Sequence, residues 1–138
     1  MKVTQLAELL GAKVVCPADR EIACGYSCDL LSWVMAHGKQ DMAWVTVQAH
    51  LNVIAVAVLA DMSCVIAAEG VKFPPDAVAK AQSEDLALLE CDKSAYEICS
   101  IMAGHIQNGL RLICVFIDLD GLKRANDLYG HTFGDLML

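Results

Sequence analysis

The residues with the most specific chemistry lie between positions 115 and 135. Asp118 follows an apolar run, and a carboxylate at the end of a buried strand can hold a hard cation such as Mg²⁺ through its oxygen atoms. Gly121 and Leu122 open the next predicted helix, so their backbone N–H groups could face phosphate oxygens. Lys123 adds a positive charge beside them. This order of residues predicts a site for Mg²⁺ and phosphate.

Two further polar residues in the same segment are suited to a nucleobase. Asn126 lies one turn further along the predicted helix, and its amide can both donate and accept hydrogen bonds, as the edge of guanine requires. Asp135 could accept hydrogen bonds from the N–H groups of the base. The segment therefore predicts one side of a guanine nucleotide site.

The run Val115–Asp135 resembles the opening of a GGDEF domain, the catalytic domain of diguanylate cyclases. The resemblance implies a metal carboxylate at Asp118, a phosphate-contacting turn at Gly121 and Leu122, and guanine recognition by Asn126 and Asp135. Further positions match the framework of the motif: Asp120, Asp127, Gly130, His131 and Gly134. Gly121 departs from the family, in which bulky residues are common at this position.

The Gly-Gly-Asp/Glu-Glu-Phe hairpin that names the family does not occur in this sequence. It would supply another metal carboxylate and the turn that carries the substrate. Phosphoryl-type chemistry depends on positioning and charge neutralisation, so we expect negligible turnover from half a site. About 30 residues cannot bury a core alone, so the segment must dock on the preceding domain or remain loosely ordered. In the alternative interpretation it is a strand–helix unit that completes the sheet of that domain.

The composition of the 138 residues indicates a folded chain with little attraction for polyanions. Hydrophobic residues make up 57% and charged residues 20%, which argues against disorder. The net charge of −7 disfavours nucleic acid and anionic lipid as partners. The most apolar stretch, from 53 to 68, is interrupted by Asp61 and is too short to span a membrane. The first residues do not resemble a signal peptide.

The seven cysteines have no Cys-x-x-Cys spacing, so a zinc site or a thioredoxin-type motif is not indicated. Most lie in apolar runs, where cysteine behaves as a small hydrophobic residue. We expect structural thiols and a reducing, cytoplasmic environment. The cysteines occupy positions 16, 24, 28, 64, 91, 99 and 114.

Strands and helices alternate along the chain, and most of the strands are continuous apolar runs. Such strands are typical of a parallel sheet that is covered by helices on both faces, so the fold class is α/β with a mostly parallel sheet. A polar break at 107–109 predicts two units, 1–108 and 109–138. We expect helices that begin at Thr4, Ser27, Leu51, Pro74 and Ser94, a last helix from about Leu122, and strands at 13–16, 22–26, 42–47, 63–67, 86–90 and 110–117.

Residues 1–106 resemble a second family, the DRTGG domains. The resemblance rests on several ordered blocks, with one departure at Ala23-Cys24-Gly25, where the family has Thr-Gly-Gly. The blocks are Gly25–Ala36, Trp44–Ala57, Gly70 with Pro74-Pro75, and Ala95-Tyr96-Glu97. Related domains precede the kinase domain of HPr kinase/phosphorylase or lie beside CBS pairs, so the resemblance implies a regulatory module with the fold of that amino-terminal domain. The phosphate-binding loop that such a kinase needs does not occur in the chain.

Two groups of polar residues in this first unit could bind a ligand. Thr46, Gln48, His50 and Asn52 follow an apolar strand where a helix begins, and ligands of open α/β sheets bind at the carboxyl ends of strands. Exposed amides at the helix start would favour an anion. Alternatively, His50 or Asn52 only caps the helix. Ser27 and Asp29 form the second group, for which the alternative is an ordinary N-cap beside the positive helix start.

Two functions remain open. The first is a non-catalytic regulatory module that binds a small anionic ligand, a nucleotide or a partner protein, and that forms a homodimer. The second is the amino-terminal portion of a diguanylate cyclase, which converts GTP to cyclic di-GMP, with the DRTGG-like domain as its input. No catalytic residue is assigned. No cofactor is expected for the first unit, and Mg²⁺ is expected only if the GGDEF-like domain is complete in the parent protein.

The first function predicts that the purified 138-residue chain forms no cyclic dinucleotide from GTP and Mg²⁺, because the acidic hairpin is missing. Chromatographic analysis of a long incubation at high protein concentration would measure this. A product peak above that of a sample carrying Asp118→Ala would contradict the prediction.

Overall fold

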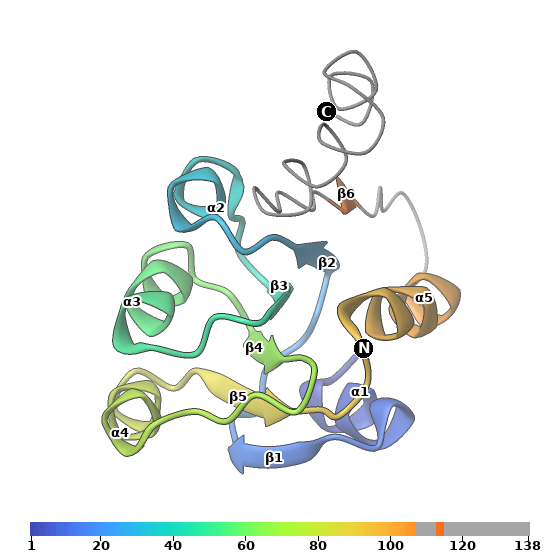
Figure 1. Ribbon diagram of the computed structural model, residues 1–138, viewed down its shortest axis with the longest axis horizontal. Coiled ribbons are helices and arrows are strands. Elements are labelled where there is room, and N and C mark those ends of the chain that lie inside the picture. The colour runs from blue at the N-terminus through green and yellow to red at the C-terminus, as the bar shows by residue number, and fades with distance from the viewer. Residues whose placement is uncertain (107–112, 115–138) are drawn as a thin grey trace, which may run out of the picture.

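The computed structural model describes residues 1–106 and the backbone of 113–114, and these residues form an α/β fold built on one sheet (Figure 1). The strand order is β1-β5-β4-β3-β2-β6. All neighbouring strands are parallel except β1, which runs antiparallel to β5 at one edge. The strands are β1 (Lys13–Cys16), β2 (Cys24–Ser27), β3 (Met42–Thr46), β4 (Cys64–Ala67), β5 (Ala87–Glu90) and β6 (Ile113–Cys114).

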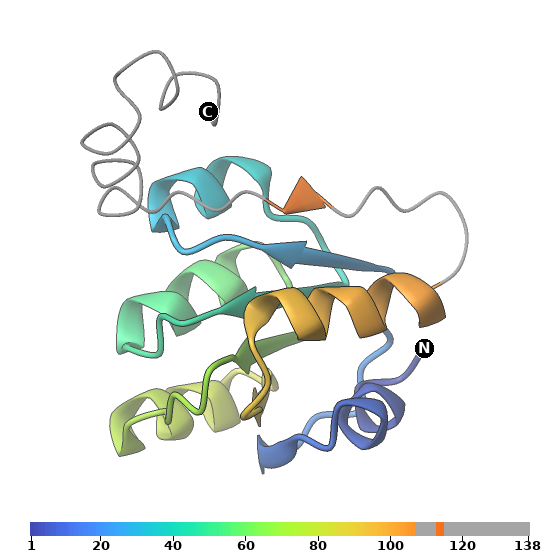
Figure 2. The same ribbon diagram turned by 45° about the vertical axis from the view of Figure 1, so that its right-hand side comes forward.

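The helices cover both faces of the sheet, as Figures 1 and 2 show. Strands β2 to β5 are neighbours in sequence order, so the three helices between them cross on the same face. Helices α1 and α5 cover the other face. The helices are α1 (Val3–Leu10), α2 (Leu31–His37), α3 (Leu51–Leu59), α4 (Pro75–Ser83) and α5 (Ala95–His105). The predicted fold class, a mostly parallel sheet with helices on both faces, is confirmed.

The sheet separates two hydrophobic cores, because successive side chains of each strand point to opposite faces. Trp44 is fully buried in the core under α2 to α4, and its Nε1–H donates to the Cys28 carbonyl oxygen at 2.8 Å. Val45, the next residue, lies in the core under α1 and α5. Burial on both faces explains why the central strands are continuous apolar runs.

Two predicted helix starts are wrong. Thr4 lies inside α1, which begins at Val3, and the Gln5 side chain accepts from the Lys2 N–H at 2.8 Å. Ser27 is the last residue of β2 and is buried, so it is not an N-cap; α2 begins four residues later. In both places the prediction relied on the preference of serine and threonine for the N-cap position. Ser27 instead pairs with β3 as part of β2, and the helix near Thr4 begins one residue earlier, with Lys2 at its N-cap position.

Two other helix ends are as predicted. Gly11 ends α1 with φ of 61°, a left-handed conformation that glycine adopts without steric cost. Ser94 caps α5: its hydroxyl accepts from the Glu97 N–H at 3.1 Å, and the Glu97 carboxylate accepts from the Ser94 N–H at 2.8 Å. These bonds to Ser94 lower the pKa of Glu97.

Strand β6 pairs in parallel with β2, with Tyr26 opposite Ile113 and Ser27 opposite Cys114. This short pairing is compatible with both interpretations of the carboxyl-terminal segment, because a docked GGDEF-like strand and a strand–helix unit that completes the sheet would each give it. The remaining residues from 107 to 138 lie outside the described part of the chain.

Gly38 at the end of α2 is a place of close approach. A Cβ atom there would lie 2.7 Å from the Cε of buried Met62 and 2.9 Å from the Val34 carbonyl oxygen. Its φ of −60° is open to any residue, so space alone restricts the position.

We therefore predict that Gly38→Ala lowers the free energy of unfolding by about 1–3 kcal/mol through overpacking. Urea denaturation followed by circular dichroism would measure the loss. Gly104→Ala is the matched control, because nothing lies within 4 Å of a Cβ at that helical position. Alanine is the better helix former, so this variant should be unchanged or slightly more stable.

Candidate ligand site at the carboxyl ends of the strands

The parallel strands β2 to β5 all end at the same edge of the sheet, and the predicted polar residues of the first unit follow two of them. Asp29 lies in the loop after β2, and Gln48 and His50 lie in the loop after β3. Because β2 and β3 are hydrogen-bonded neighbours, these two loops are adjacent. The edge thus brings together residues that the sequence places in two separate groups.

The Asp29 carboxylate joins the two loops. Its Oδ1 accepts from the Thr46 hydroxyl at 2.7 Å and from the Val47 N–H at 2.9 Å. The Thr46 hydroxyl oxygen in turn accepts from the Gln48 N–H at 3.0 Å. Hydrogen bonds to a charged carboxylate are among the stronger ones, so this network holds the backbone of the β3 loop in place. Asp29 and Thr46 therefore fix the positions of the Val47 and Gln48 backbone N–H groups.

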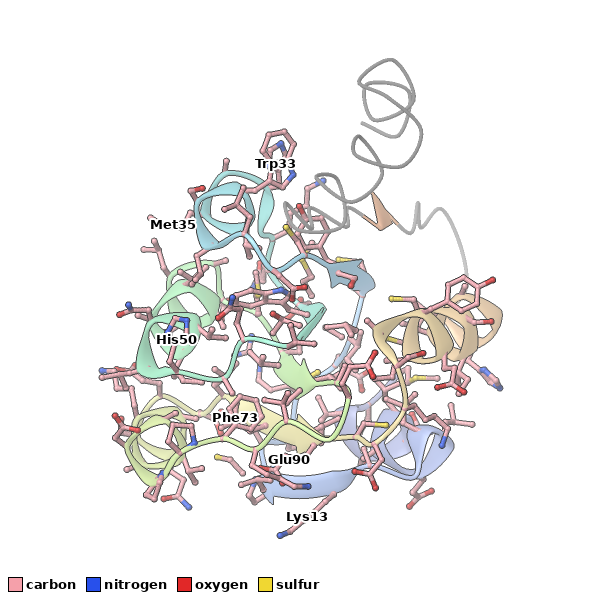
Figure 3. All side chains as sticks on the ribbon, viewed as in Figure 1. Lys13, Trp33, Met35, His50, Phe73 and Glu90 are labelled. Atoms are coloured by element: carbon pink, nitrogen blue, oxygen red, sulfur yellow. The ribbon has the colours of Figure 1, made fainter. Side chains whose placement is uncertain are left out.

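His50 occupies the N-cap position of α3, but its side chain does not cap the helix. One ring nitrogen, Nε2, lies 3.1 Å from Gln48 Oε1 instead, and the ring is exposed at the start of the helix (Figure 3). No side-chain cap covers the first turn of this nine-residue helix. The partial positive charge of an uncapped helix start can attract an anion.

Two predicted site residues lie away from this cluster. Ser27 is buried at the end of β2, and strand alternation directs it to the sheet face opposite that of Tyr26. Asn52 is exposed and lines a hollow between α2 and α3. The structure therefore keeps Asp29, Thr46, Gln48 and His50 together and separates Ser27 and Asn52 from them.

A further charged residue at this edge escaped the sequence analysis. Glu90 ends β5 and is only 6% exposed; its Oε1 accepts from the Phe73 N–H at 2.9 Å, and its carboxylate lies 3.4 Å from Lys72 Nζ (Figure 3). A buried carboxylate is costly unless it is paired in this way. The available signal was a charge that directly follows the apolar run from 86 to 89.

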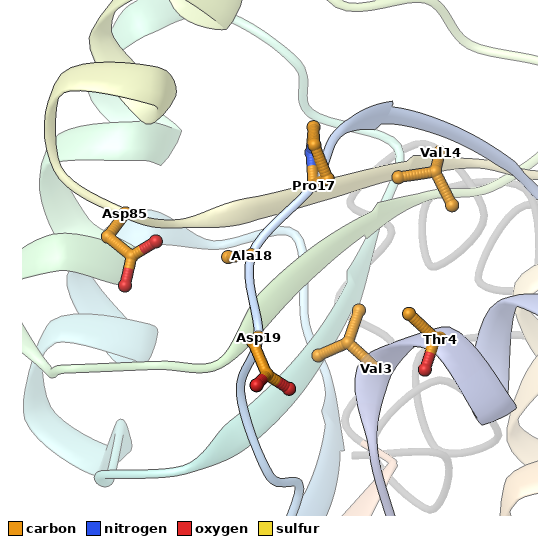
Figure 4. A pocket seen from close by; sticks show the side chains of 7 residues that line it. All are labelled: Val3, Thr4, Val14, Pro17, Ala18, Asp19 and Asp85. Atoms are coloured by element: carbon orange, nitrogen blue, oxygen red, sulfur yellow. The ribbon is translucent and has the colours of Figure 1, made fainter.

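A second hollow, of about 450 Å³, lies beside the edge strand β1 (Figure 4). Its carboxylates come from Asp19, which is paired with Lys2 Nζ at 2.6 Å, and from Asp85. Thr4, the predicted cap, lies on its wall. It is lined by Val3, Thr4, Val14, Pro17, Ala18, Asp19 and Asp85.

Most of the cysteines in residues 1–106 are buried among apolar residues, and no disulfide bond joins Cys16, Cys24, Cys28, Cys64 or Cys91. Burial raises the pKa of the Cys64 thiol to about 12, so this thiol stays protonated and unreactive at neutral pH. In residues 1–106, no three side chains of His, Cys, Asp or Glu are grouped so that they could hold a metal ion.

Within the described chain, no helix combines the length and the apolar character that crossing a membrane requires.

The predicted nucleotide and metal residues of the carboxyl-terminal segment lie outside the described residues. They are Asp118, Gly121, Leu122, Lys123, Asn126 and Asp135. Their assignments stay predictions.

Comparison with known proteins shows a similarity of fold. No protein-family model and no curated protein matches the sequence. The fold is similar to a crystal structure of the CBS and DRTGG domains of the regulatory region of Clostridium perfringens pyrophosphatase, with a TM-score of 0.58 and 8% identity. The match covers 92% of this chain and 60% of that chain. It supports the DRTGG-like fold and adds no support for the GGDEF resemblance.

The Asp29 network predicts the local stability of the site. Asp29→Ala should release the Val47 and Gln48 amides, so that their hydrogen exchange becomes at least about tenfold faster, the equivalent of one charged hydrogen bond. NMR-detected exchange would measure this. Asp29→Asn is the control, because its side-chain oxygen can still accept both bonds. Equal exchange in the alanine variant and the unmodified chain would contradict the assigned role of the carboxylate.

Proposed function

We propose that this chain is a non-catalytic regulatory module that binds a small anionic ligand at the carboxyl edge of β2 and β3. The carrying observation is the Asp29–Thr46 network, which holds the β3 loop so that His50, Gln48 and the uncapped start of α3 lie together. A site that is ordered before binding loses less entropy when the ligand arrives. Helix amides and an imidazole ring suit phosphate or carboxylate oxygens.

The same edge supports a ligand that carries hydroxyl groups as well as negative charge. The other carboxylate oxygen of Asp29, Oδ2, makes no hydrogen bond to the described residues and can accept from a hydroxyl. A nucleotide meets both requirements, with a phosphate at the start of α3 and a ribose hydroxyl at Asp29. The similar regulatory region of Clostridium perfringens pyrophosphatase was crystallised with a nucleotide activator, diadenosine tetraphosphate. A nucleotide is therefore the first ligand class to test.

A regulatory role also agrees with what the described residues contain. The metal-binding and nucleotide-binding residues implied by the GGDEF resemblance belong to the other segment, and no observation on residues 1–106 favours a cyclase. We propose that ligand binding is passed on through α3, whose first turn lies at the site and whose body packs on the sheet. A protein partner in place of a small ligand is the alternative that the experiment below distinguishes.

Isothermal titration calorimetry with ATP, diadenosine tetraphosphate and inorganic phosphate tests the proposal on the full chain. We expect saturable binding of a nucleotide, weaker binding of its 2′,3′-dideoxy form, and about tenfold weaker binding to His50→Ala, the loss of one charge-assisted hydrogen bond. His105→Ala is the matched control, because this histidine is also exposed but lies at the far end of α5. Its binding should be unchanged.

The absence of binding to every ligand in the panel would overturn the small-ligand proposal and favour a protein partner. Binding that His50→Ala leaves intact would place the ligand elsewhere on the molecule.

A further inference from the structure

Helix α3 is apolar on all of its sides. Of the nine residues from Leu51 to Leu59, Asn52 alone is polar. One side of the helix, which includes Val53 and Ile54, is buried against the sheet, while the other side is exposed. A helix that is hydrophobic all round is normally buried all round. The exposed side of α3 therefore has the composition of a buried surface.

Helix α2 extends this exposed apolar surface. The side chain of Met35 is 57% exposed and points away from the sheet, and that of Leu59 on α3 is 73% exposed (Figure 3). Between the two helices lies a hollow of about 360 Å³. We call this surface the α2–α3 face and define it by the residues that line the hollow: Leu31, Met35, Asn52, Ala55, Val56 and Leu59.

No element of residues 1–106 lies outside the α2–α3 face, as Figures 1 and 2 show. Both of its helices also lack Asp, Glu, Lys and Arg. The other helices of the described chain carry Glu8 in α1, Asp76 and Lys80 in α4, and Glu97 in α5. The absence of charge is therefore a property of this face and not of helices in this protein generally.

The missing charge indicates what covers the face. Two copies of a chain with a net charge of −7 repel each other, so close association is favoured where neither copy brings carboxylates into the contact. The α2–α3 face meets this condition. A highly charged protein partner would find no complementary charge on it, and the net charge disfavours an anionic lipid surface. A second copy is the occupant that the charges favour.

We propose that the α2–α3 face is a self-complementary interface through which two copies of this chain form a reversible, two-fold symmetric dimer. A two-fold interface uses the same surface on both copies, so projections and hollow must both lie on it. Met35 and Leu59 project, and the hollow between the helices can receive the same side chains of the second copy. Asn52 is self-compatible, because one amide group both donates and accepts.

The size of the face sets the strength of the association. The seven residues of α2 and the nine of α3 span about 11 and 14 Å along their axes. An interface on this scale lies at the low end of specific interfaces, below about 1,200 Å² in total. The dimer should therefore dissociate in the micromolar range and depend on concentration. This inference goes beyond the proposed ligand site, which is formed by the loops at the strand ends, and does not depend on it.

Sedimentation velocity of the full chain between about 1 and 200 µM, concentrations that bracket a weak interface, tests the proposal. The average mass should rise from 14.9 kDa toward twice that value. Leu59→Lys should weaken the association at least about tenfold, because each copy would then bring an unpaired charge into the apolar hollow of the other. Lysine makes the net charge less negative, so general repulsion between the copies cannot explain the loss.

Tyr96→Lys is the matched control, since Tyr96 is 76% exposed on α5 at the other face of the sheet. It makes the same change of charge and should leave the association unchanged. Thermal unfolding of each variant checks that it is folded. A monomer at every concentration would overturn the proposal, as would a dimer that Leu59→Lys leaves intact or one that Tyr96→Lys also dissociates.

Discussion

The parallel run of β2, β3, β4 and β5, with every connecting helix on the same face, is the constraint on which the rest of the structure depends. It places the ends of four strands at one edge of the sheet and makes the loops of β2 and β3 neighbours. The hydrogen bonds of Asp29 depend on that arrangement, because its partners Thr46 and Val47 lie at the end of a different strand, β3. The candidate site is thus a direct consequence of strand order.

The same connections give α3 three roles. Its buried side fills the core beside Trp44, its first turn forms part of the candidate site, and its outer side forms part of the α2–α3 face. Trp44 also stabilises the site, because its indole N–H donates a hydrogen bond to the carbonyl oxygen of Cys28, the residue before Asp29. The proposed ligand site and the proposed interface therefore share one helix.

Much of the fold could be predicted from local patterns, because hydrophobic period and capping chemistry are properties of short segments. The apolar run from 42 to 47 predicted β3, and the Ser94–Glu97 box predicted the start of α5. Predictions failed where the deciding partner is distant in sequence. Ser27 pairs within a strand instead of capping a helix. The direction of β1, which runs antiparallel to β5 in the mostly parallel sheet, was not predicted at all. The residue types from 13 to 16 do not indicate whether the strand runs parallel or antiparallel to its neighbour.

The candidate site divides in the same way. The sequence by itself determined that polar residues follow two buried strands, that a helix begins at Leu51, and that the sheet is covered on both faces. Only the tertiary structure decided that Asp29 reaches Thr46 across 17 positions, that Asn52 belongs to another surface, and that Glu90 is buried and paired with Lys72. The reason is physical: a periodic pattern states which side of an element avoids water, whereas hydrogen bonds between loops require the order and register of the strands that carry them.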